Sequence, residues 1–490
     1  MSKVSYVKTK IDGSINGAFR YKDLEIRSKW VDYIFANTFT DFQRGINGNK
    51  NFEKQKSLSS KNITIDLETQ VIKVKWKFLL KKSIEYWLYL IQLFTVILKP
   101  NHKIDFKNIC ILYGVNWSQL KNEDFSLDNL HRFIKTFFFD TKILNESRVI
   151  LVTDRKFPKL KTHKEFITSN YASIALAKYL TRVGKKRLLN LCLKTIAYQV
   201  MYIFKDGKYS LINLSVLDQL VLDKACKELD IKITLVCTQS VLLSPPLAFY
   251  YKGDYFNSKM GFWYSDNNLA IPHNSQSLKD FSYDFFKVDL LDRIFVWSES
   301  YAAVLREHTE AKIDVTDPIL VNNQSHQSSE LVVKKTTKTI SFFGISPLLD
   351  LANLHFNQLQ NSIDDLAAFS ILIQNETFSK VNFILKVKRE FSRNYHYQDY
   401  FRTIMSISKL RNVEIVTGEE KAVEVIRKSS LVVCTPYTSA ALIAKHFGIK
   451  TVFFTDKNQY QLPVRYEGID VLIGKDNLYK HLITELVLGR

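Results

Sequence analysis

The stretch 429–456 constrains the fold of this chain more than any other. It reads SSLVVCTPYTSAALIAKHFGIKTVFFTD. Residues 431–434 and 451–454 are apolar runs rich in β-branched side chains, which is typical of buried strands. Between them lies an alanine-rich segment that ends near His446, and Gly448 stands where a glycine commonly follows a helix. The stretch therefore predicts a strand–helix–strand unit, the building block of a parallel sheet.

Two hydroxyl side chains, Thr438 and Ser439, stand at the start of the predicted helix, directly after Pro436 and Tyr437. The first turn of a helix has N–H groups without intrahelical partners and the positive end of the helix dipole, so it suits an anion such as a phosphate. The carboxyl end of a parallel strand is also where ligands bind. The alternative is that both hydroxyls only cap the helix. The residues alone leave the two interpretations open.

The run Pro436-Tyr437-Thr438-Ser439 resembles the Pro-Phe-Thr-Ser motif of a group of bacterial surface-polysaccharide biosynthesis proteins, with Tyr437 in place of the phenylalanine. That group is in turn similar to GT-B glycosyltransferases, in which two Rossmann-like domains face each other across a cleft. The specific match lies in the C-terminal part of the chain, and a looser similarity extends back to Asn108. The resemblance implies transfer of a sugar from a nucleotide-activated donor, commonly without a bound metal.

Strands and helices alternate along the rest of the chain, which predicts doubly wound parallel sheets. The expected strands are 108–115, 148–152, 232–237, 293–297, 339–344, 381–387, 413–416 and 471–473. The expected helices are 171–179, 186–205, 216–229, 298–308, 359–374, 400–409, 420–428 and 478–488. A polar segment at 321–339 indicates a linker.

The predicted fold class is therefore α/β and GT-B-like, with two Rossmann-like domains facing across a cleft and an extra N-terminal helical region. We expect a basic N-terminal region at 1–105, an acceptor domain at 106–330 and a nucleotide-sugar donor domain at 331–490.

Residues 238–289 are predicted to form a long, aromatic-rich connection. Aromatic rings beside carboxylates and amides suit the C–H faces and hydroxyl edges of sugars, and long loops of this kind are often functional. The alternative is a hairpin that only closes the edge of the sheet. Asp254, Asp266 and His273 lie in this connection and are the candidates for a catalytic base that takes the proton of an acceptor hydroxyl.

The second domain offers further candidates for binding the donor phosphates. Gly344 and Ser346 follow its first strand, and Lys386, Lys388 and Arg389 lie at the carboxyl end of its second strand, where cations can contact a phosphate. The alternative is that the three cations are solvated surface residues of a lysine-rich chain. The predicted donor-binding set is completed by Pro436, Tyr437, Thr438 and Ser439.

The charge of the chain favours anionic partners. The net charge is +20, and residues 1–105 hold 19 Lys/Arg against 10 Asp/Glu. Such a surface suits phosphorylated small molecules, anionic lipid or nucleic acid. The apolar run 84–98 follows several lysines and suits a helix lying on an anionic membrane. Its nearly all-round apolar character favours, somewhat more, a helix buried in the fold.

Motifs that are missing narrow the function. The sequence has no phosphate-loop or dinucleotide glycine motif and no clustered metal ligands, so no metal or cofactor is expected beyond the nucleotide-sugar substrate. Asp364 and Asp365 are interpreted as a solvated helix face. The alternatives to a transferase are a non-catalytic GT-B scaffold in polysaccharide assembly and a nucleic-acid-binding protein, although the recognition motifs of the latter are missing.

The expected location is the cytoplasm, or the inner face of the cytoplasmic membrane as a peripheral protein. Five scattered cysteines without a paired motif indicate reduced thiols. No apolar run is long enough to span a bilayer, and the start of the chain lacks the apolar core of a signal peptide. The expected partners are a nucleotide sugar and a glycan or lipid-linked glycan acceptor.

Overall fold

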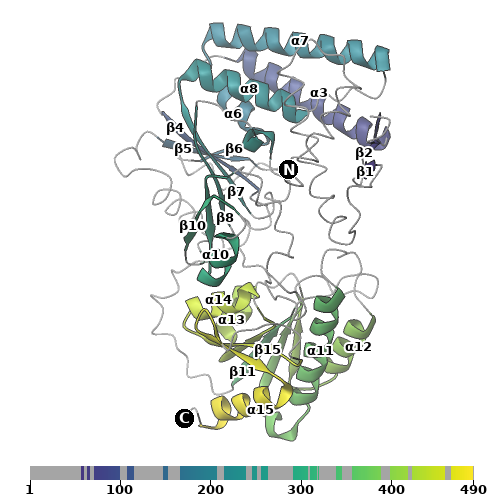
Figure 1. Cartoon of the computed structure of the whole chain (residues 1–490), viewed down its shortest axis with the longest axis vertical. Helices are drawn as coiled ribbons and strands as arrows, with labels where there is room; N and C mark the ends of the chain where they lie inside the picture. The colour runs from purple at the N-terminus through teal and green to yellow at the C-terminus, as the bar shows by residue number, and fades with distance from the viewer. Residues whose placement is uncertain are drawn as a thin grey trace.

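A computed structural model describes the parts of the chain that position the candidate site. The described residues are 57–59, 63–66, 71–74, 76–99, 107–114, 147–152, 166–206, 214–238, 246–250, 255–262, 291–306, 309–316, 318, 338–344, 356–387, 398–417, 422–436, 438–457 and 465–488. They form two α/β units that follow each other along the long axis of the molecule (Figure 1).

The first unit is built on a parallel sheet of seven strands among the described residues, in the spatial order β10-β9-β8-β7-β4-β5-β6. Its strands are β4 (Asn108–Tyr113), β5 (Ser147–Val152), β6 (Phe166–Ser169), β7 (Lys232–Thr238), β8 (Phe256–Phe262), β9 (Arg293–Val296) and β10 (Lys312–Val315). Its helices are α6 (Ala172–Ala177), α7 (Arg182–Asp206), α8 (Leu214–Leu229) and α10 (Glu299–Arg306), with a short 3-10 turn η4 (Leu247–Tyr250).

The second unit is built on a sheet whose described strands have the order β13-β12-β11-β14-β15-β17-β16, all parallel except β16. The strands are β11 (Thr339–Phe343), β12 (Asn382–Lys386), β13 (Val413–Val416), β14 (Leu431–Cys434), β15 (Lys450–Thr455), β16 (Arg465–Tyr466) and β17 (Ile469–Ile473). The helices are α11 (Phe356–Ile373), α12 (Gln398–Ile407), α13 (Ala422–Lys428), α14 (Ser439–His446) and α15 (Lys475–Ile483), with the short turns η7 (Glu376–Phe378) and η8 (Thr484–Leu488).

The two sheets share one topology. If the strands are numbered by their order within each unit and β16 is left out, six strands of both sheets run 3-2-1-4-5-6, which is the Rossmann order. The first unit adds β10 at its edge, and the second adds the antiparallel β16. In both units the chain reverses its direction of travel between strands 1 and 4, which are β4 and β7 in one and β11 and β14 in the other. The predicted α/β class with two Rossmann-like domains is confirmed, whereas the cleft between them stays a prediction.

Helices cover both faces of the second sheet. The helices before and after the reversal of the chain lie on opposite faces. One face packs Phe342, Val433 and Phe454 against α11, α12 and α15. The other packs Cys434 and Phe453 against α13 and α14. The strands are therefore buried on both sides, which explains why they read as continuous apolar runs in the sequence.

The connection predicted at 238–289 contains a strand, so this prediction is wrong in part. β8 pairs with β7 and β9 in the interior of the first sheet. Its sequence, FNSKMGF, lacks the apolar run of a buried strand. Lys259 lies in the middle of it, and its buried ammonium is satisfied by the carbonyl of Phe249 at 3.0 Å. The spacing of apolar residues does not reveal that a buried lysine is satisfied by a backbone carbonyl.

The N-terminal region contributes a small antiparallel sheet and one long helix to the described residues. The sheet consists of β1 (Ser57–Ser59), β2 (Ile63–Asp66) and β3 (Val71–Val74), and the helix is α3 (Trp76–Leu98). Tyr89 of α3 shares a 2.8 Å hydrogen bond with Ser173 of α6. The side of α3 that holds Tyr89 is buried in the first unit, so the expectation of a packed helix is confirmed for that side.

The two units touch where α10 meets the turn between β16 and β17. The hydroxyls of Ser298 and Tyr466 are 2.8 Å apart, and the Ser300 N–H donates to the carboxylate of Glu467 at 2.8 Å. Trp297 and Tyr301 of the first unit belong to the same cluster of buried apolar residues as Tyr466. The hydrophobic core is therefore continuous from one unit to the other.

All five cysteines are buried and free, as the sequence predicts. Burial raises the pKa of Cys192 and of Cys434 to about 12, which keeps these thiols protonated. Among the described residues, no helix is both long and apolar enough to cross a membrane.

Candidate functional site

The point where the chain reverses in the second sheet brings two predicted segments together. Phe343 at the end of β11 lies opposite Cys434 at the end of β14. The Thr435 N–H donates to the Phe343 carbonyl at 3.0 Å, which extends this pairing past the strand ends. Gly344 and the segment that starts at Pro436 therefore leave the sheet at neighbouring places. Ligands of doubly wound sheets bind at this kind of position.

The start of α14 differs from a capped helix start. Thr438 is the N-cap residue, with φ −75° and ψ 140°, but its side chain makes no capping hydrogen bond. Its hydroxyl donates instead to the Thr435 carbonyl at 3.2 Å. Elsewhere in the chain Asn375 does cap η7, accepting from the Thr377 N–H at 3.0 Å. The alternative that the motif hydroxyls only cap the helix is therefore wrong for Thr438.

Donors remain available at this helix start. Within the described part of the chain, no acceptor is found for the N–H groups of Ser439 and Ala440 or for the Ser439 hydroxyl. The Thr438 and Ser439 side chains are half-buried, so they are still reachable from solvent. Uncapped N–H groups combined with the helix dipole favour a bound anion.

Thr435 adds a buried donor beside the motif. It is 2% exposed, and its hydroxyl has no hydrogen-bond partner among the described residues. A buried hydroxyl without a partner is costly, and ligands or water usually satisfy such a group. The base of the candidate site thus holds unused hydrogen-bonding capacity.

Gly344 is fitted closely to its surroundings. A Cβ atom built at this position would lie 3.0 Å from Cε1 of Phe342, which is tighter than nine in ten real Cβ contacts. The Phe342 ring cannot move away easily, because it is buried and stacks on Phe369 with ring centroids 4.5 Å apart. The structure therefore favours glycine at the end of β11, because a larger residue would have to displace the Phe342 ring.

Lys386 is buried, so the alternative of a solvated surface cation is wrong for it, whereas its contact with a phosphate stays a prediction. It is 7% exposed, and its ammonium donates to the carbonyls of Val387 at 3.2 Å and Thr417 at 2.7 Å. It thereby joins the ends of β12 and β13, on the side of β11 that lies away from β14. These contacts suit a residue that positions the loops after both strands.

The other predicted site residues lie outside the described residues. They are the motif residue Tyr437, the loop residues Ser346, Lys388 and Arg389, and the candidate bases Asp254, Asp266 and His273. Their assignments stay predictions.

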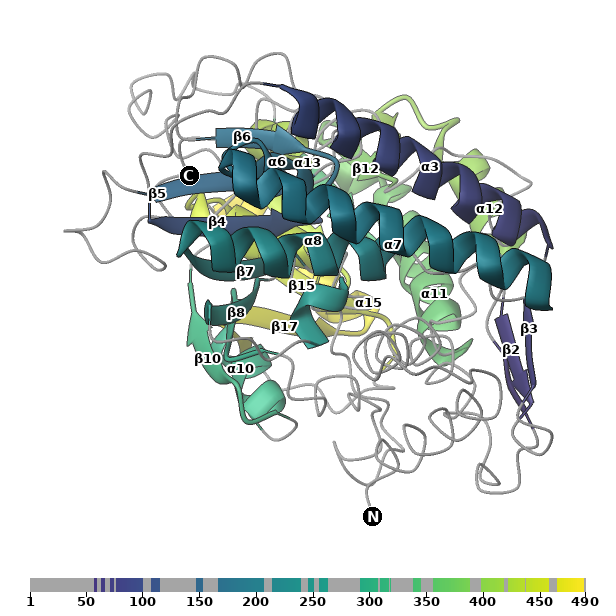
Figure 2. The same cartoon turned by 90° about the horizontal axis from the view of Figure 1, so that it is seen from above.

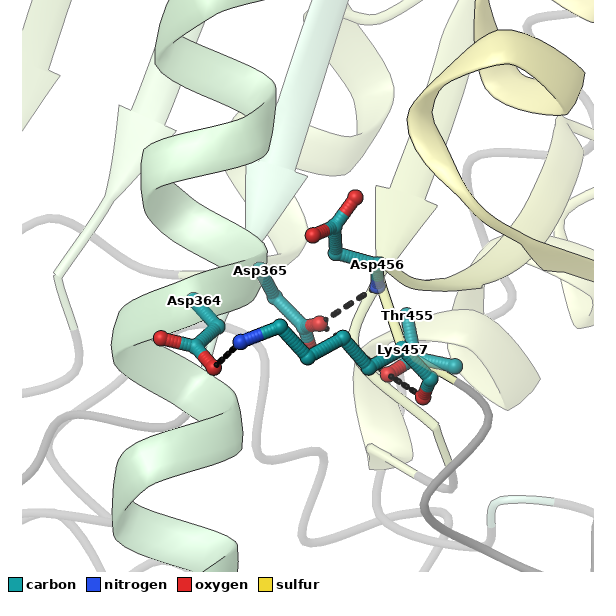
Figure 3. Close-up of polar contacts among 5 residues, drawn as sticks. All are labelled: Asp364, Asp365, Thr455, Asp456 and Lys457. Carbon is teal, nitrogen blue, oxygen red and sulfur yellow. Dashed lines mark hydrogen bonds and ion pairs between the residues drawn. The ribbon is translucent and has the colours of Figure 1, made fainter.

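A polar cluster that sequence reasoning missed lies at the carboxyl end of β15 (Figure 3). Asp365 of α11 is 2% exposed, so its assignment to a solvated helix face is wrong. Its carboxylate accepts from the Thr455 hydroxyl at 3.0 Å and from the Asp456 N–H at 2.8 Å. Burial raises the pKa of Asp365 to about 7, although these hydrogen bonds lower it. Asp364 lies nearer the surface and pairs with Lys457 at 2.6 Å.

One turn before Asp365 on the same side of α11, Asn361 is 3% exposed, and its amide oxygen and nitrogen both lack partners among the described residues. The available signal was the spacing, because positions 361, 365, 369 and 372 make up the core side of an amphipathic helix. At these core positions, the Asp365 carboxylate binds the end of β15, whereas the Asn361 amide has no partner among the described residues.

In the first unit, polar side chains tie α3 and α6 to α8. Ser173 donates to the carboxylate of Asp218, and Tyr89 bonds to the same serine. Burial raises the pKa of Asp218 to about 6. Asp223 of α8 accepts from Tyr255, just before β8. These contacts fix the packing of the helices. Among the described residues, no group of three potential metal ligands occurs in either unit.

Comparison with known families decides the assignment. The model of the family described as "Polysaccharide biosynthesis PFTS motif protein" matches residues 203–482, more than half of the chain, and this range includes the segment Pro436-Tyr437-Thr438-Ser439. The chain belongs to this family. In this PFTS-motif protein, the motif lies between β14 and α14, where the chain reverses in the second sheet. No curated protein sequence matches the chain.

Solved structures similar to the PFTS-motif protein include glycosyltransferases. TarM is 12% identical and covers 77% of this chain and 91% of its own, with a TM-score of 0.42. The UDP-GlcNAc 2-epimerase of Neisseria meningitidis is 11% identical, with 78% and 91% covered and a TM-score of 0.38. The E. coli ADP-heptose heptosyltransferase II is 10% identical, with 78% and 99% covered and a TM-score of 0.32. The predicted membership in the PFTS-motif group is thus confirmed by the family match, and the GT-B-like fold class rests on the two tandem Rossmann-type sheets.

Proposed function

We propose that this PFTS-motif protein is a metal-independent GT-B-type glycosyltransferase. It moves a sugar from a nucleotide-activated donor to a bacterial surface polysaccharide or its lipid-linked precursor. The observation that supports this most is the uncapped start of α14 at the reversal point of the second sheet, within the family's own motif. A helix start of this kind binds a phosphate without a metal.

The donor phosphates accept hydrogen bonds from the N–H groups of Ser439 and Ala440 and from the Ser439 hydroxyl. Thr435 lies beneath them with an unused hydroxyl. As the bond between the sugar and the phosphate breaks, negative charge grows on the phosphate oxygen that leaves. Donors fixed before the reaction stabilise that charge more than water does, because they need no reorientation.

Cations from the loop after β12 complete the donor side. Lys388 and Arg389 follow the strand within a few residues and supply positive charge to the leaving phosphate. Lys386 holds the base of that loop through its bonds to Val387 and Thr417. On this assignment Lys386 is a positioning residue.

The acceptor binds from the first unit. Its hydroxyl oxygen attacks the anomeric carbon of the sugar, the bond from that carbon to the phosphate breaks, and the hydroxyl proton passes to a base. Asp254, Asp266 and His273 are the candidates for the base, as the sequence predicts. A lipid-linked acceptor would bring the protein from the cytoplasm to the inner face of the membrane, as a peripheral protein.

The donor site is tested by replacing both motif hydroxyls with methyl groups in the Thr438→Ala/Ser439→Ala variant. We expect the donor to bind about tenfold more weakly, a loss of about 1.4 kcal/mol. The Ser439 hydroxyl no longer donates to the phosphate, and the Thr438 hydroxyl no longer holds the Thr435 carbonyl at the start of α14. The measurement is titration calorimetry with the sugar nucleotide that stabilises the wild-type protein most in a thermal-shift screen of uridine, cytidine, guanosine and thymidine sugars.

Ser408→Ala is the matched control, because this exposed hydroxyl lies at the end of α12 and donates only to the Met405 carbonyl. It should leave the donor affinity unchanged. An unaltered affinity in the double variant would remove the site assignment. Donor binding without transfer or hydrolysis would favour a non-catalytic scaffold. Tight, steeply salt-dependent binding of nucleic acid would favour a nucleic-acid-binding protein.

A further inference from the structure

The outward side of α3 is an exposed apolar stripe. It consists of Leu80, Ile84, Trp87, Leu88, Ile91 and Leu98, whose exposed fractions range from 44% at Trp87 to 85% at Leu98. Their spacing places them on one side of a helix. The opposite side, which holds Tyr86, Tyr89, Leu90, Leu93 and Val96, is buried in the first unit. The helix is therefore apolar on two sides, and among the described residues only the side that holds Tyr89 is buried.

From Leu80 to Leu98 the stripe extends over about 27 Å, which is 18 steps of 1.5 Å along the helix, and the exposed Thr95 lies between Ile91 and Leu98. The polar residue within it, Thr95, satisfies its hydroxyl inside the helix by donating to the Ile91 carbonyl at 2.8 Å. The Thr95 hydroxyl therefore does not need a hydrogen bond from water. Single exposed apolar residues are ordinary on a protein surface, but a contiguous row is typical of an interaction site.

The surroundings of the stripe are strongly basic. α7 packs along α3 (Figure 2), and the Lys185 ammonium donates to the Lys99 carbonyl at 2.8 Å. Together the sequences of α3 and α7 hold nine Lys/Arg against two Asp/Glu. The exposed residues of α7 include Arg182, Lys186 and Lys194 and also the apolar Val183 and Leu193.

The position of these helices leaves them accessible to a large partner. α3 and α7 lie at the end of the first unit that points away from the second unit (Figure 1). The second unit, which holds the candidate donor site, is therefore not in the way of an extended surface that meets α3 and α7.

We propose that α3, together with the basic exposed residues of α7, docks on the surface of an anionic lipid bilayer. Apolar side chains from one helix side enter the boundary between headgroups and acyl chains, and the neighbouring cations contact anionic headgroups. The helix lies in the plane of the surface, in keeping with the finding that no described helix can span a membrane. This surface goes beyond the proposed transfer reaction, because it lies in a different unit from the motif.

Charge complementarity selects lipid over a second copy of this chain. In a symmetric dimer through α3, each basic surface would face its own copy, and like charges would repel. An anionic bilayer pairs the same cations with opposite charge and needs no fitted pocket for the stripe.

The test uses the full chain and sedimentation with vesicles of phosphatidylcholine that contain phosphatidylglycerol, or of phosphatidylcholine alone, at low and high salt. The wild-type protein should bind the anionic vesicles at least about tenfold more tightly than the neutral ones, and high salt should reduce this preference. Leu88→Gln/Ile91→Gln should weaken binding at least about tenfold, because two inserted side chains become polar. Lys186→Glu/Lys194→Glu should abolish the preference for anionic vesicles.

The matched control is Ile371→Gln/Met405→Gln, which changes two exposed apolar residues of α11 and α12 and should bind vesicles like the wild-type protein. The proposal is overturned if wild-type protein stays in solution with anionic vesicles, or if the α3 variant binds as the wild type does. It is also overturned if the α3 variant instead changes the protein's mass in analytical ultracentrifugation, which would make a second copy the occupant. Donor affinity of the α3 variant should be unaltered, so this test is independent of the proposed reaction.

Discussion

Asp365 is a buried carboxyl group whose energetics depend on pH near neutrality. Burial raises its pKa from 3.8 to about 7. The folded protein therefore keeps a proton there that the unfolded chain has already lost. The stability associated with the protonated group is present at low pH and is lost as the pH rises from about 4 to about 7.

We predict that Asp365→Asn removes this pH dependence. An asparagine oxygen can still accept from the Thr455 hydroxyl and the Asp456 N–H, but it carries no charge. The melting temperature of the variant relative to the wild type should rise as the pH increases from 4 to 7 and should level off above 7. The corresponding slope in the free energy of unfolding is at most about 1.4 kcal/mol per pH unit.

Differential scanning calorimetry across this pH range gives the measurement. Asp364→Asn is the control, because Asp364 forms a surface ion pair with Lys457 and should not show this rise. A melting difference between Asp365→Asn and wild type that stays flat with pH would show that Asp365 does not titrate in this range.

At the scale of single residues, the sequence predicts where polar side chains lie better than it predicts their hydrogen-bond partners. The motif hydroxyls follow a strand and begin a helix, as the order of apolar runs predicts, and the anion proposed to bind them stays a prediction. That Thr438 bonds to the Thr435 carbonyl instead of capping its helix depends on side-chain geometry that spacing does not encode. The same holds for Lys386, whose ammonium found two backbone carbonyls.

At the scale of secondary-structure elements, continuous apolar runs predicted most of the described strands. β11, β12 and β14 were expected within a residue or two, because both their faces are buried. The strands β1, β2, β3, β6, β8, β10 and β16 were missed. β10 is a short edge strand with alternating exposure, and β8 carries a buried lysine that is paired to a carbonyl outside the strand. Local composition cannot reveal a charge that tertiary contacts satisfy.

The helix α10 has its first turn completed by the other unit. Ser298 accepts from the Tyr301 N–H at 3.2 Å, and Glu467 accepts from the Ser300 N–H at 2.8 Å. A carboxylate at a helix start also interacts favourably with the helix dipole. Glu467 has a left-handed φ of 52°, so the turn holds this contact despite backbone strain.

We predict that Glu467→Ala destabilises the protein by about 1 kcal/mol, because an N–H group of α10 loses its acceptor and the helix loses a favourable charge. Glu467→Gln keeps the acceptor and should lose less. Glu467→Gly loses the same cap but relieves the left-handed backbone, so it should be more stable than the alanine variant. Chemical denaturation measures all three.

Glu299→Ala is the control for the lost charge, since Glu299 lies in the first turn of the same helix and forms an exposed ion pair with Arg306. It should destabilise the protein less than Glu467→Ala, because the Ser300 N–H keeps its acceptor. If Glu467→Ala were as stable as the wild type, the contact between the units would carry no measurable energy.

At the scale of the whole molecule, two sheets of the same topology share a continuous core. Trp297 and Tyr301 from one unit cluster with Tyr466 and Ile469 from the other. A chain of two independent domains would bury such residues separately. The alternation of strands and helices predicts two tandem Rossmann-like units. It does not predict the contact between them, because the hydrogen bonds of that contact join residues 167 and 168 positions apart.

We predict that the wild-type chain unfolds in one cooperative calorimetric transition because of this contact. Tyr466→Ala should split the transition into two, since removing a buried aromatic side chain costs about 3–5 kcal/mol and empties the contact. Tyr466→Phe removes the hydroxyl that bonds to Ser298 but keeps the buried ring, so it should keep one transition with a lower melting temperature. Two transitions in the wild-type protein would contradict a shared core.

The burial of all five cysteines has a practical consequence for studying this protein. A maleimide dye should leave the folded wild-type chain unlabelled, because thiols of this kind are neither reachable nor ionised. One cysteine introduced at an exposed position, such as Ile371 on α11, would then be the single reactive handle on the molecule. Fluorescence from a dye at this position would then report on the second unit in real time, without prior replacement of the five native cysteines.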